Sequence, residues 1–246
     1  MIMQRQTPKL KSEKDCTGCG ACIASCPKGA ITKKSVGMGA WIPLIDQNKC
    51  IQCGKCEMIC NRAYTQKTVP YKAYIAYNRD ENVRLKSASG GVFSALATYV
   101  IDHGGSVFGA EMRFDNGRAI VEHNCITQIQ ELPRILGSKY VQSDSGKSYE
   151  TVKKELLKGK IVLFSGCSCQ IDGLKKYLGD TDQTKLYTID LICHGVPGIE
   201  LFNEYIQYLG KRYKGNVRRF SFRTKATNGI DYKITATLDE KSGGTI

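Results

Sequence analysis

Cys16-Thr-Gly-Cys19-Gly-Ala-Cys22-Ile-Ala-Ser-Cys26-Pro27 is the stretch that decides the fold of the first part of this chain. The same C-x2-C-x2-C-x3-C spacing returns 34 residues later, as Cys50-Ile-Gln-Cys53-Gly-Lys-Cys56-Glu-Met-Ile-Cys60. Glycine follows the second cysteine of both runs, as Gly20 and Gly54. The repetition indicates an internal duplication of one cysteine-rich unit.

The spacing within each run favours iron–sulfur chemistry. Three cysteines two residues apart can reach three corners of one cubane cluster, whereas the fourth begins a helix and points toward the other cluster. A single C-x2-C pair would favour zinc, but this spacing, found twice, fits separated tetrahedral zinc sites poorly. The predicted ligands are Cys16, Cys19, Cys22 and Cys60 for one [4Fe-4S] cluster, and Cys50, Cys53, Cys56 and Cys26 for the second.

Composition limits the class of protein further. The chain has 246 residues, of which 41% are hydrophobic and 24% charged, so disorder is excluded as its main state. The longest apolar stretch, from Val92 to Ile101, is about half of the ~20 residues that span a bilayer. The N-terminus has no signal-peptide pattern, so we expect a cytoplasmic protein. In that reducing compartment, the 12 cysteines favour metal or redox chemistry over disulfides.

The formal charge of +13 needs a correction for metal-bound thiolates. Each oxidised cluster with four thiolates carries about −2, so two clusters lower the charge to about +9. Lysines and arginines are scattered in pairs, which fits either a solvated basic face or a docking surface for an acidic redox partner or anionic cofactor. A nucleic-acid-binding protein with structural zinc is a rival class that requires salt-sensitive binding.

A polar segment from Asn61 to Pro70 predicts a domain boundary. We expect an α+β ferredoxin-like two-cluster module in residues 1–69, and an α/β domain with a mainly parallel sheet in residues 70–246. A strand from Tyr71 to Tyr77 is expected to precede a helix that carries Val92, Leu96, Tyr99 and Val100 on one face. Further strands are predicted near 106–112, 119–126, 161–164, 186–192, 218–223 and 231–238, and helices at 147–158, 170–178 and after 197.

Four chemically active side chains follow two predicted strands of the parallel sheet. Ligands of such sheets bind outside the carboxyl ends of the strands. Successive strand ends can be neighbours in space, so we expect these side chains to lie together. They are Cys167, Cys169, Cys193 and His194.

The chain resembles two known families, one in each part. The cysteine runs resemble a bacterial-type two-cluster ferredoxin over about residues 8–68, with Asn61 in place of a proline. Residues 70–225 resemble the beta-subunit family of coenzyme F420-reducing hydrogenase and dehydrogenase, most closely its bacterial branch, in which a ferredoxin module precedes the beta-subunit domain. The stretches that carry this resemblance are SASGGVFSALA (87–97), GSKYVQS (137–143), VLFSGCSCQIDGLKKYL (162–178) and DLICHGVP (190–197).

This resemblance implies an iron–sulfur flavoprotein oxidoreductase. FAD would exchange electrons with the iron–sulfur clusters and with a deazaflavin-like or other two-electron acceptor. Ser89-Gly90-Gly91 is then a candidate cradle for the flavin phosphate, with a plain helix N-cap as the alternative. Lys139 is a candidate phosphate contact, with an ordinary surface turn as the alternative.

The resemblance also suggests roles at the strand ends. Cys169 and Cys193 look like ligands of a third cluster, and His194 is either a proton donor, a cofactor contact or a turn residue. Cys167 departs from the family pattern Gly-Thr-Pro-Cys, as a substitute ligand or as a buried thiol. Cys125 is expected in the core, and His123 shows no pairing pattern.

A second departure is that the family continues past the equivalent of Ile246 with a further cysteine-rich stretch. We therefore expect an α/β domain that is incomplete at its C-terminus, with a third cluster only if further ligands exist. The alternative function is a non-catalytic ferredoxin-type electron carrier or docking subunit, without flavin.

Overall fold

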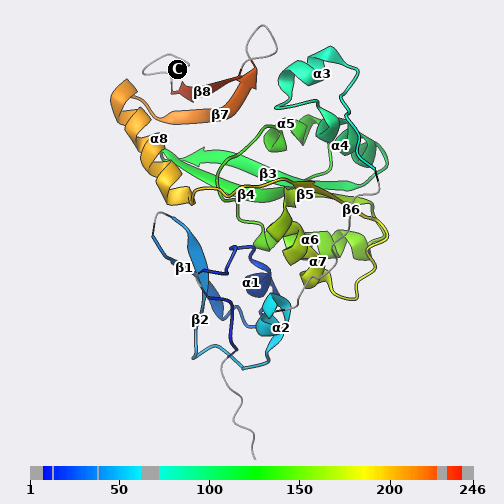
Figure 1. The fold of residues 1–246 in the computed structure, drawn as a ribbon, viewed down its shortest axis with the longest axis vertical. Coiled ribbons are helices and arrows are strands. Elements are labelled where there is room, and N and C mark those ends of the chain that lie inside the picture. Colours follow the sequence, from blue (N-terminus) through cyan, green and yellow to red (C-terminus); the bar gives the residue numbers. More distant parts are fainter. Residues whose placement is uncertain (1–7, 13, 38, 62–71, 226–231, 240–246) are drawn as a thin grey trace, which may run out of the picture.

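The computed structural model describes residues 8–12, 14–37, 39–61, 72–225 and 232–239. The cysteine-rich part lies at one end of the molecule, below the larger α/β part in Figure 1. The predicted boundary segment, 61–70, lies outside the described residues except for its first position. No helix in the described part of the chain is long and apolar enough to cross a membrane.

The two cysteine runs adopt the same local backbone conformation. The residue before the second cysteine, Gly18 or Gln52, has a φ of 66° or 54°, and the glycine after it, Gly20 or Gly54, has a φ of 78° or 73°. Glycine adopts such left-handed conformations without steric cost, so the loop can curl around its sulfur atoms. A short helix follows each loop, α1 (Ala21–Ser25) and α2 (Lys55–Asn61). Between them, β1 (Ile31–Ser35) and β2 (Trp41–Ile45) form an antiparallel hairpin.

A four-stranded sheet in the order β4-β3-β5-β6 forms the centre of the α/β part. β3 (Ser106–Asp115) and β4 (Arg118–Ile126) are an antiparallel hairpin, whereas β5 (Val162–Cys167) and β6 (Leu186–Leu191) continue the sheet in parallel from β3. The hairpin turn at Asn116-Gly117 has two positive φ angles, which match the twist of the strands. The predicted fold class, a ferredoxin-like part followed by an α/β part with a mainly parallel sheet, is confirmed.

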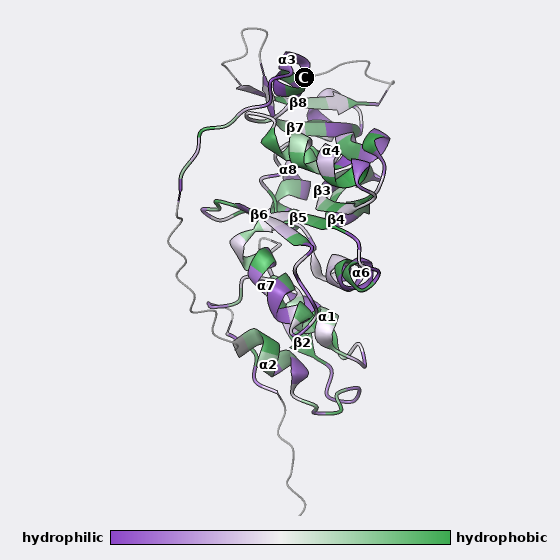
Figure 2. Cartoon of the chain, turned by 90° about the vertical axis from the view of Figure 1, so that its right-hand side faces the viewer, coloured by the Kyte–Doolittle hydropathy of each residue, from purple (hydrophilic) through white to green (hydrophobic). Residues whose placement is uncertain are grey.

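Helices cover both faces of the sheet. In Figure 1, α3 (Glu81–Lys86), α4 (Val92–Asp102) and α5 (Leu132–Ile135) lie on one side, and α6 (Gly146–Leu157) and α7 (Ser168–Leu178) on the other. A short 3-10 helix, η1 (Ile129–Glu131), precedes α5. Figure 2 shows mainly hydrophobic residues on β4, β5 and α4. Alternate residues of β5 serve the two cores, since Leu163 packs under α4 whereas Phe164 packs under α6 and α7.

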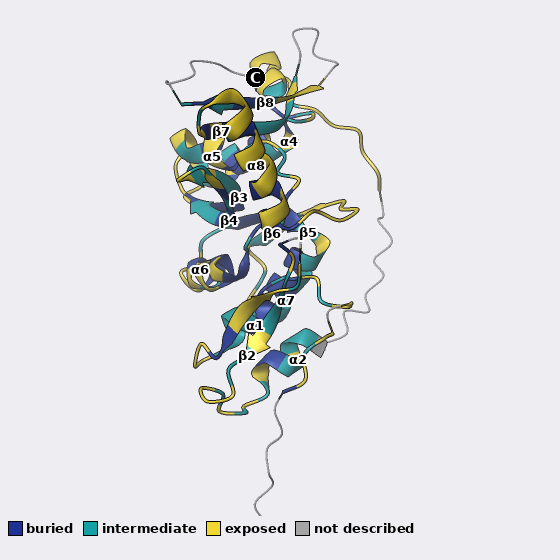
Figure 3. Ribbon diagram, turned by 90° about the vertical axis from the view of Figure 1, so that its left-hand side faces the viewer, coloured by how far each residue is buried: buried dark blue, intermediate teal, exposed yellow. Residues whose placement is uncertain are grey.

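The C-terminal elements pack beyond the hairpin. They are α8 (Ile199–Tyr213), β7 (Val217–Lys225) and β8 (Tyr232–Leu238), of which the two strands pair antiparallel. The buried Asn203 side chain accepts a hydrogen bond from the Ala119 N–H (2.6 Å) and donates one to its carbonyl oxygen (3.3 Å). These bonds satisfy both backbone groups of Ala119 on the edge strand β4. The outward face of α8 is exposed (Figure 3).

The predicted strand from Tyr71 to Tyr77 is wrong for its described residues. Residues 72–77 are outside any helix or strand, and Tyr71 lies outside the described residues. Ile75 is fully exposed, and Tyr74 and Tyr77 are also exposed. The pattern of β-favouring residues was present, but these residues pair with no strand of the described sheets, and a strand needs a paired neighbour.

The predicted apolar face of α4 is also wrong in part. Val100 is buried, but Val92, Leu96 and Tyr99 are exposed, whereas the small residue Ala97 is fully buried. A small side chain at the contact lets the helix axis approach the sheet closely. The larger apolar residues therefore lie at the rim of the contact.

Tyr149 joins the two parts of the molecule. Its side chain is fully buried in the core under the sheet, together with Ala21 of α1. Its hydroxyl lies 2.8 Å from the carbonyl oxygen of Cys19 and 3.0 Å from that of Gln170. The Ser145 hydroxyl lies 3.0 Å from the same oxygen atom. One buried phenol thus links the first cysteine loop to both α6 and α7.

We predict that Tyr149→Phe lowers the free energy of unfolding by roughly 1–3 kcal/mol, because buried carbonyl groups lose a hydrogen-bond donor. Urea unfolding of the anaerobic protein, followed by circular dichroism, measures this change. Tyr177→Phe is the matched control, since Tyr177 is a neighbouring tyrosine that is only partly buried. Equal effects of the two substitutions would contradict the assigned role of Tyr149.

Candidate functional site

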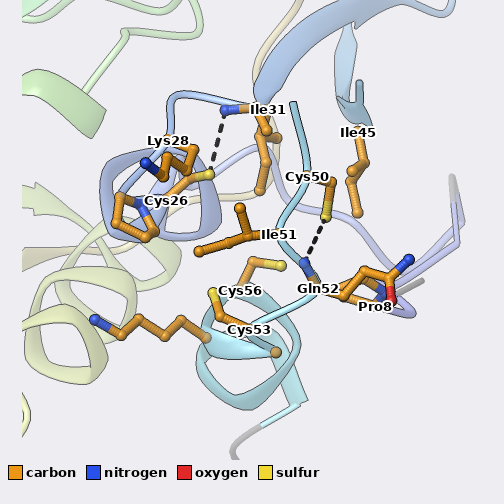
Figure 4. A pocket seen from close by; sticks show the side chains of 14 residues that line it. Pro8, Cys26, Lys28, Ile31, Ile45, Cys50, Ile51, Gln52, Cys53 and Cys56 are labelled. Carbon is orange, nitrogen blue, oxygen red and sulfur yellow. Dashed lines mark hydrogen bonds between the residues drawn. The ribbon is translucent and has the colours of Figure 1, made fainter. Parts of the chain in front are cut away.

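One hollow within the cysteine-rich part is lined by Cys26, Cys50, Cys53 and Cys56 (Figure 4). These four cysteines are the second quartet, and their hollow is the second-quartet hollow. The rest of its wall is mostly apolar and comes from residues 8–55, including Ile31, Ile45 and Ile51. The fourth cysteine of the first run thus lies with the first three cysteines of the second run. An apolar wall excludes water from whatever the four sulfur atoms bind.

Backbone N–H groups point toward sulfur atoms of this hollow. The Ala30 N–H donates to Cys26 Sγ (3.2 Å), and the Gln52 N–H donates to Cys50 Sγ (3.4 Å). Such bonds stabilise negative charge on thiolate sulfur and help to set the potential of an iron–sulfur cluster. Four thiols around a hollow, with N–H donors directed at them, fit a [4Fe-4S] cluster.

Another hollow, the first-quartet hollow, is lined by the first cysteine quartet, Cys16, Cys19, Cys22 and Cys60. Trp41 and Ile59 contribute to its wall from the cysteine-rich part. The α/β part also contributes to the wall, because one side of α7 faces the four thiols. These α7 residues are Cys169, Asp172, Gly173 and Lys176.

Gly173 allows the close approach of α7 to the first cysteine loop. A Cβ atom at this position would lie 3.1 Å from Cys19 Sγ and 3.1 Å from Tyr149 Oη. Contacts this short would push the helix away from the loop. The absence of a side chain at Gly173 therefore brings the α/β part against the cysteine hollow.

Burial raises the pKa of the Cys22 thiol to about 12, and the neighbouring thiols add to this shift. Burial also raises the pKa of Cys19 and of Cys56. Iron binds thiolates, so binding in these hollows releases protons, and the positive charge of the iron offsets the cost of burying the thiolates.

The structure thus groups the eight cysteines into the two predicted quartets, and the assignment of these residues as ligands stays a prediction. No three of the described His, Cys, Asp and Glu side chains converge as the ligands of one metal ion do. Each quartet instead surrounds a hollow. A polynuclear cluster suits this arrangement, because its thiolates bind separate iron atoms.

The structure also brings together three cysteines at the strand ends. Cys167 ends β5, Cys169 lies in the first turn of α7, and Cys193 follows β6. A hydrogen bond joins the thiols of Cys167 and Cys193, and another joins Cys169 to Thr17 in the first cysteine loop. His194 is exposed in the loop after β6. The assignment of Cys169, Cys193 and His194 as catalytic residues stays a prediction.

A buried polar network beside these thiols was not found from the sequence. His123 Nε2 lies 3.0 Å from the carbonyl oxygen of Ser165, so this nitrogen donates, and Nδ1 accepts from the Ser143 hydroxyl (3.2 Å). The Gln170 amide donates to Ser143 Oγ (2.9 Å), and its oxygen accepts from the Cys167 N–H (3.0 Å). No spacing signal predicts this network, because its members come from three separate segments of the chain.

The candidate flavin-binding residues make bonds within the chain. Gly91 precedes α4 with a φ of 77°, and a Cβ atom at Gly90 would lie 2.9 Å from the carbonyl oxygen of Ala76. The Ser89 carbonyl oxygen accepts a hydrogen bond from Lys225. Lys139 Nζ donates to the carbonyl oxygen of Leu136 (2.6 Å). The Gly90 backbone and Lys139 thus contact other parts of the chain, and binding of a flavin phosphate by these residues stays a prediction.

Comparisons with known proteins agree with this division of the chain. Residues 15–64 match the 4Fe-4S dicluster domain, and residues 159–242 match the family of the C terminus of the coenzyme F420 hydrogenase/dehydrogenase beta subunit. A relative, the iron-sulfur A subunit of the CoB–CoM heterodisulfide reductase of Methanocaldococcus jannaschii, is 31% identical over 139 residues, or 45% of this chain. The match covers 21% of that protein, so this chain spans about a fifth of its length.

One solved structure, the F420-reducing [NiFe] hydrogenase complex from Methanosarcina barkeri, contains a similar chain. The TM-score is 0.45 at 15% identity, over 69% of this chain and 57% of that one. A likeness at this level carries no structural argument.

The fold and the dicluster match define the class: this is an iron–sulfur protein with two [4Fe-4S] sites in its N-terminal part. More particularly, residues 159–242 match the C-terminal family of the coenzyme F420 hydrogenase/dehydrogenase beta subunit. The predicted resemblance, a dicluster ferredoxin module joined to a beta-subunit segment, is confirmed.

We predict that Cys16→Ala removes the cluster of the first quartet and leaves that of the second. Iron content of anaerobically purified protein should fall from about eight to about four atoms per chain. Cys125→Ala, which changes a thiol of β4 outside both quartets, should leave the iron content unchanged. Unchanged iron in the Cys16 variant would contradict the ligand assignment.

Burial lowers the pKa of His123 to about 4, from an ordinary value of 6.5. Nearby Asp144 opposes this shift and Lys139 adds to it. Because the unfolded chain binds the proton more readily, the folded protein loses stability as the pH falls from 6.5 toward 4, by roughly 3 kcal/mol in all.

His123→Gln should remove this part of the pH dependence. Urea unfolding measured at several pH values between 7.5 and 5 tests the expectation. His103→Gln is the control, because His103 is exposed and should leave the wild-type slope unchanged. An identical slope in the His123 variant would show that this imidazole does not titrate as described.

Proposed function

We propose that this chain passes single electrons between two [4Fe-4S] clusters, one in each cysteine quartet, and a two-electron redox group at the carboxyl edge of the sheet. The observation that carries the proposal is the contact of α7 with the first quartet. Cys169 and Gly173, near the start of a helix that follows β5, line the same hollow as Cys16, Cys19, Cys22 and Cys60.

The two hollows suggest an order of electron transfer. Only the cysteine-rich part lines the second-quartet hollow, whereas α7 helps to line the first-quartet hollow. The second quartet is therefore the entry or exit for a redox partner. The first quartet is the relay toward the α/β domain, for which we propose residues 70–246, with residues 1–69 as the cluster module.

The chain itself supplies positioning, exclusion of water and charge compensation. When bound, the clusters supply one-electron redox chemistry. N–H groups directed at Cys26 and Cys50 would compensate the charge of a cluster held by the second quartet. At the first quartet, α7 contributes an ion pair, Lys176 with Asp172 at 2.7 Å, to the wall.

A flavin as the two-electron group rests on the family resemblance alone. Bound flavin would convert between one-electron and two-electron steps, with a deazaflavin-like molecule as one candidate final acceptor. Ser89 and Lys139 make hydrogen bonds within the chain, and Ser89, Gly90, Gly91 and Lys139 remain the proposed flavin contacts. Partner subunits of a redox complex fit the basic net charge, about +9 with two clusters.

A second candidate function is a ferredoxin-type electron carrier or docking subunit without flavin. The hydrogen bond of Lys139 to the Leu136 carbonyl oxygen favours this alternative, because that ammonium is engaged within the chain.

We predict about one flavin per chain in acid extracts of anaerobically purified protein, together with about eight iron atoms. Absorbance and fluorescence of the extract measure the flavin. Flavin without iron would contradict the electron path proposed here. Iron without flavin would instead support the carrier function. In that case, addition of a one-electron donor should still give the spectrum of reduced iron–sulfur clusters.

A further inference from the structure

Cys167 and Cys193 form a thiol pair that neither cysteine quartet uses. Their side chains are hydrogen-bonded to each other. Cys167 is the last residue of β5 and pairs in register with Leu191, the last residue of the neighbouring strand β6. Cys193 follows Leu191 by two residues. Because adjacent strands lie ~4.8 Å apart, this register brings the loop that carries Cys193 to the end of β5.

The two thiols differ in how firmly they are held. Cys167 is the N-cap residue of α7, where its sulfur accepts from the Gln170 N–H and its own N–H donates to the Gln170 side chain. The network through Ser143 and His123 fixes that side chain. Cys193, in contrast, is exposed, and besides its contact with Cys167 its sulfur accepts a local bond from the Gly195 N–H (3.3 Å).

A fixed inner thiol beside an exposed outer one is the arrangement that thiol–disulfide exchange requires. The exposed sulfur can be attacked by, or can attack, an external disulfide or thiol, and the inner sulfur resolves the mixed disulfide. Cys169 is turned to a different neighbour, since it lines the first-quartet hollow and is hydrogen-bonded to Thr17. Cys167 and Cys193 thus contact each other, whereas Cys169 lies between this pair and the first-quartet hollow.

We propose that Cys167 and Cys193 form a reversible dithiol–disulfide couple that exchanges electrons with the cluster of the first quartet. In reduction, the S–S bond breaks, two electrons arrive from the cluster in two successive one-electron steps, and two protons come from solvent. The resulting dithiol passes its electron pair to an external disulfide, with Cys193 as the attacking thiol. The source of electrons rests on the proposed function, but formation of the disulfide does not.

The first experiment tests the couple itself. Anaerobic holoprotein is equilibrated with glutathione disulfide, alkylated with N-ethylmaleimide under denaturing conditions, digested, and analysed by mass spectrometry. A Cys167–Cys193 linked peptide is expected, with loss of two alkylated thiols relative to protein kept in reduced glutathione. Fragment ions distinguish Cys167 from Cys169, which lie in one peptide.

Single variants make this result specific. Cys167→Ser and Cys193→Ser should each lose the linked peptide, and a serine hydroxyl at 167 can keep the helix cap. Cys125→Ser is the matched control and should keep it. Absence of the linked peptide in wild-type protein, or a Cys169–Cys193 link in its place, overturns the proposal. A third cluster, seen as about twelve iron atoms per chain that fall to about eight in Cys193→Ser, also overturns it.

The second experiment tests the electron path. Oxidised holoprotein receives a one-electron reductant, titanium(III) citrate, and free thiols are counted over time. The disulfide should be reduced in wild-type protein and should persist in Cys16→Ala. Equal rates in the two proteins overturn the cluster-to-disulfide step. Failure of the proposed function gives a different result, because iron would then be missing from the wild-type protein. The glutathione experiment would still show whether Cys167 and Cys193 form a disulfide.

Discussion

The contact between α7 and the first cysteine loop is the constraint on which the arrangement of the molecule depends. Gly173 leaves room for Cys19, and the Tyr149 phenol reaches the carbonyl group of the same residue from inside the core. The helix also begins at the end of β5, beside Cys167. One helix therefore connects the parallel sheet, the buried core and the cysteine hollow, and displacement of its first turns would alter all three.

Local spacing was sufficient to predict the cysteine-rich part. Because Cys16 to Cys26 and Cys50 to Cys60 share one spacing, the crossed grouping of four and four could be expected before the structure was known, and the structure brings the cysteines together in that grouping. The strand and helix order after residue 105 was also predictable, since Gly159 and Gly179 mark the ends of helices whose apolar periodicity is clear.

Features that depend on contacts between distant segments were not predictable. Residues 72–77 favour a strand by composition, but a strand forms only where it pairs with a neighbouring strand. This segment pairs with no strand of the described sheets. On α4, size outweighed hydrophobicity, so that Ala97 is buried and Leu96 is exposed. The network of His123, Ser143 and Gln170 spans segments far apart in sequence, and so does the contact of Cys169 with the first cysteine hollow. Only the fold brings these residues together.

The wall of the first-quartet hollow comes from both the cysteine-rich part and α7, which has a consequence for the stability of a bound cluster toward oxygen. Iron–sulfur clusters are lost when oxygen and water reach the iron. Helix α7 covers one side of the first-quartet hollow, whereas the second-quartet hollow is enclosed by the cysteine-rich part alone. The α/β part is then a shield for one cluster only. Any movement that lifts α7 would turn the first cluster into the oxygen-sensitive point of the chain, and would leave its neighbour as protected as before.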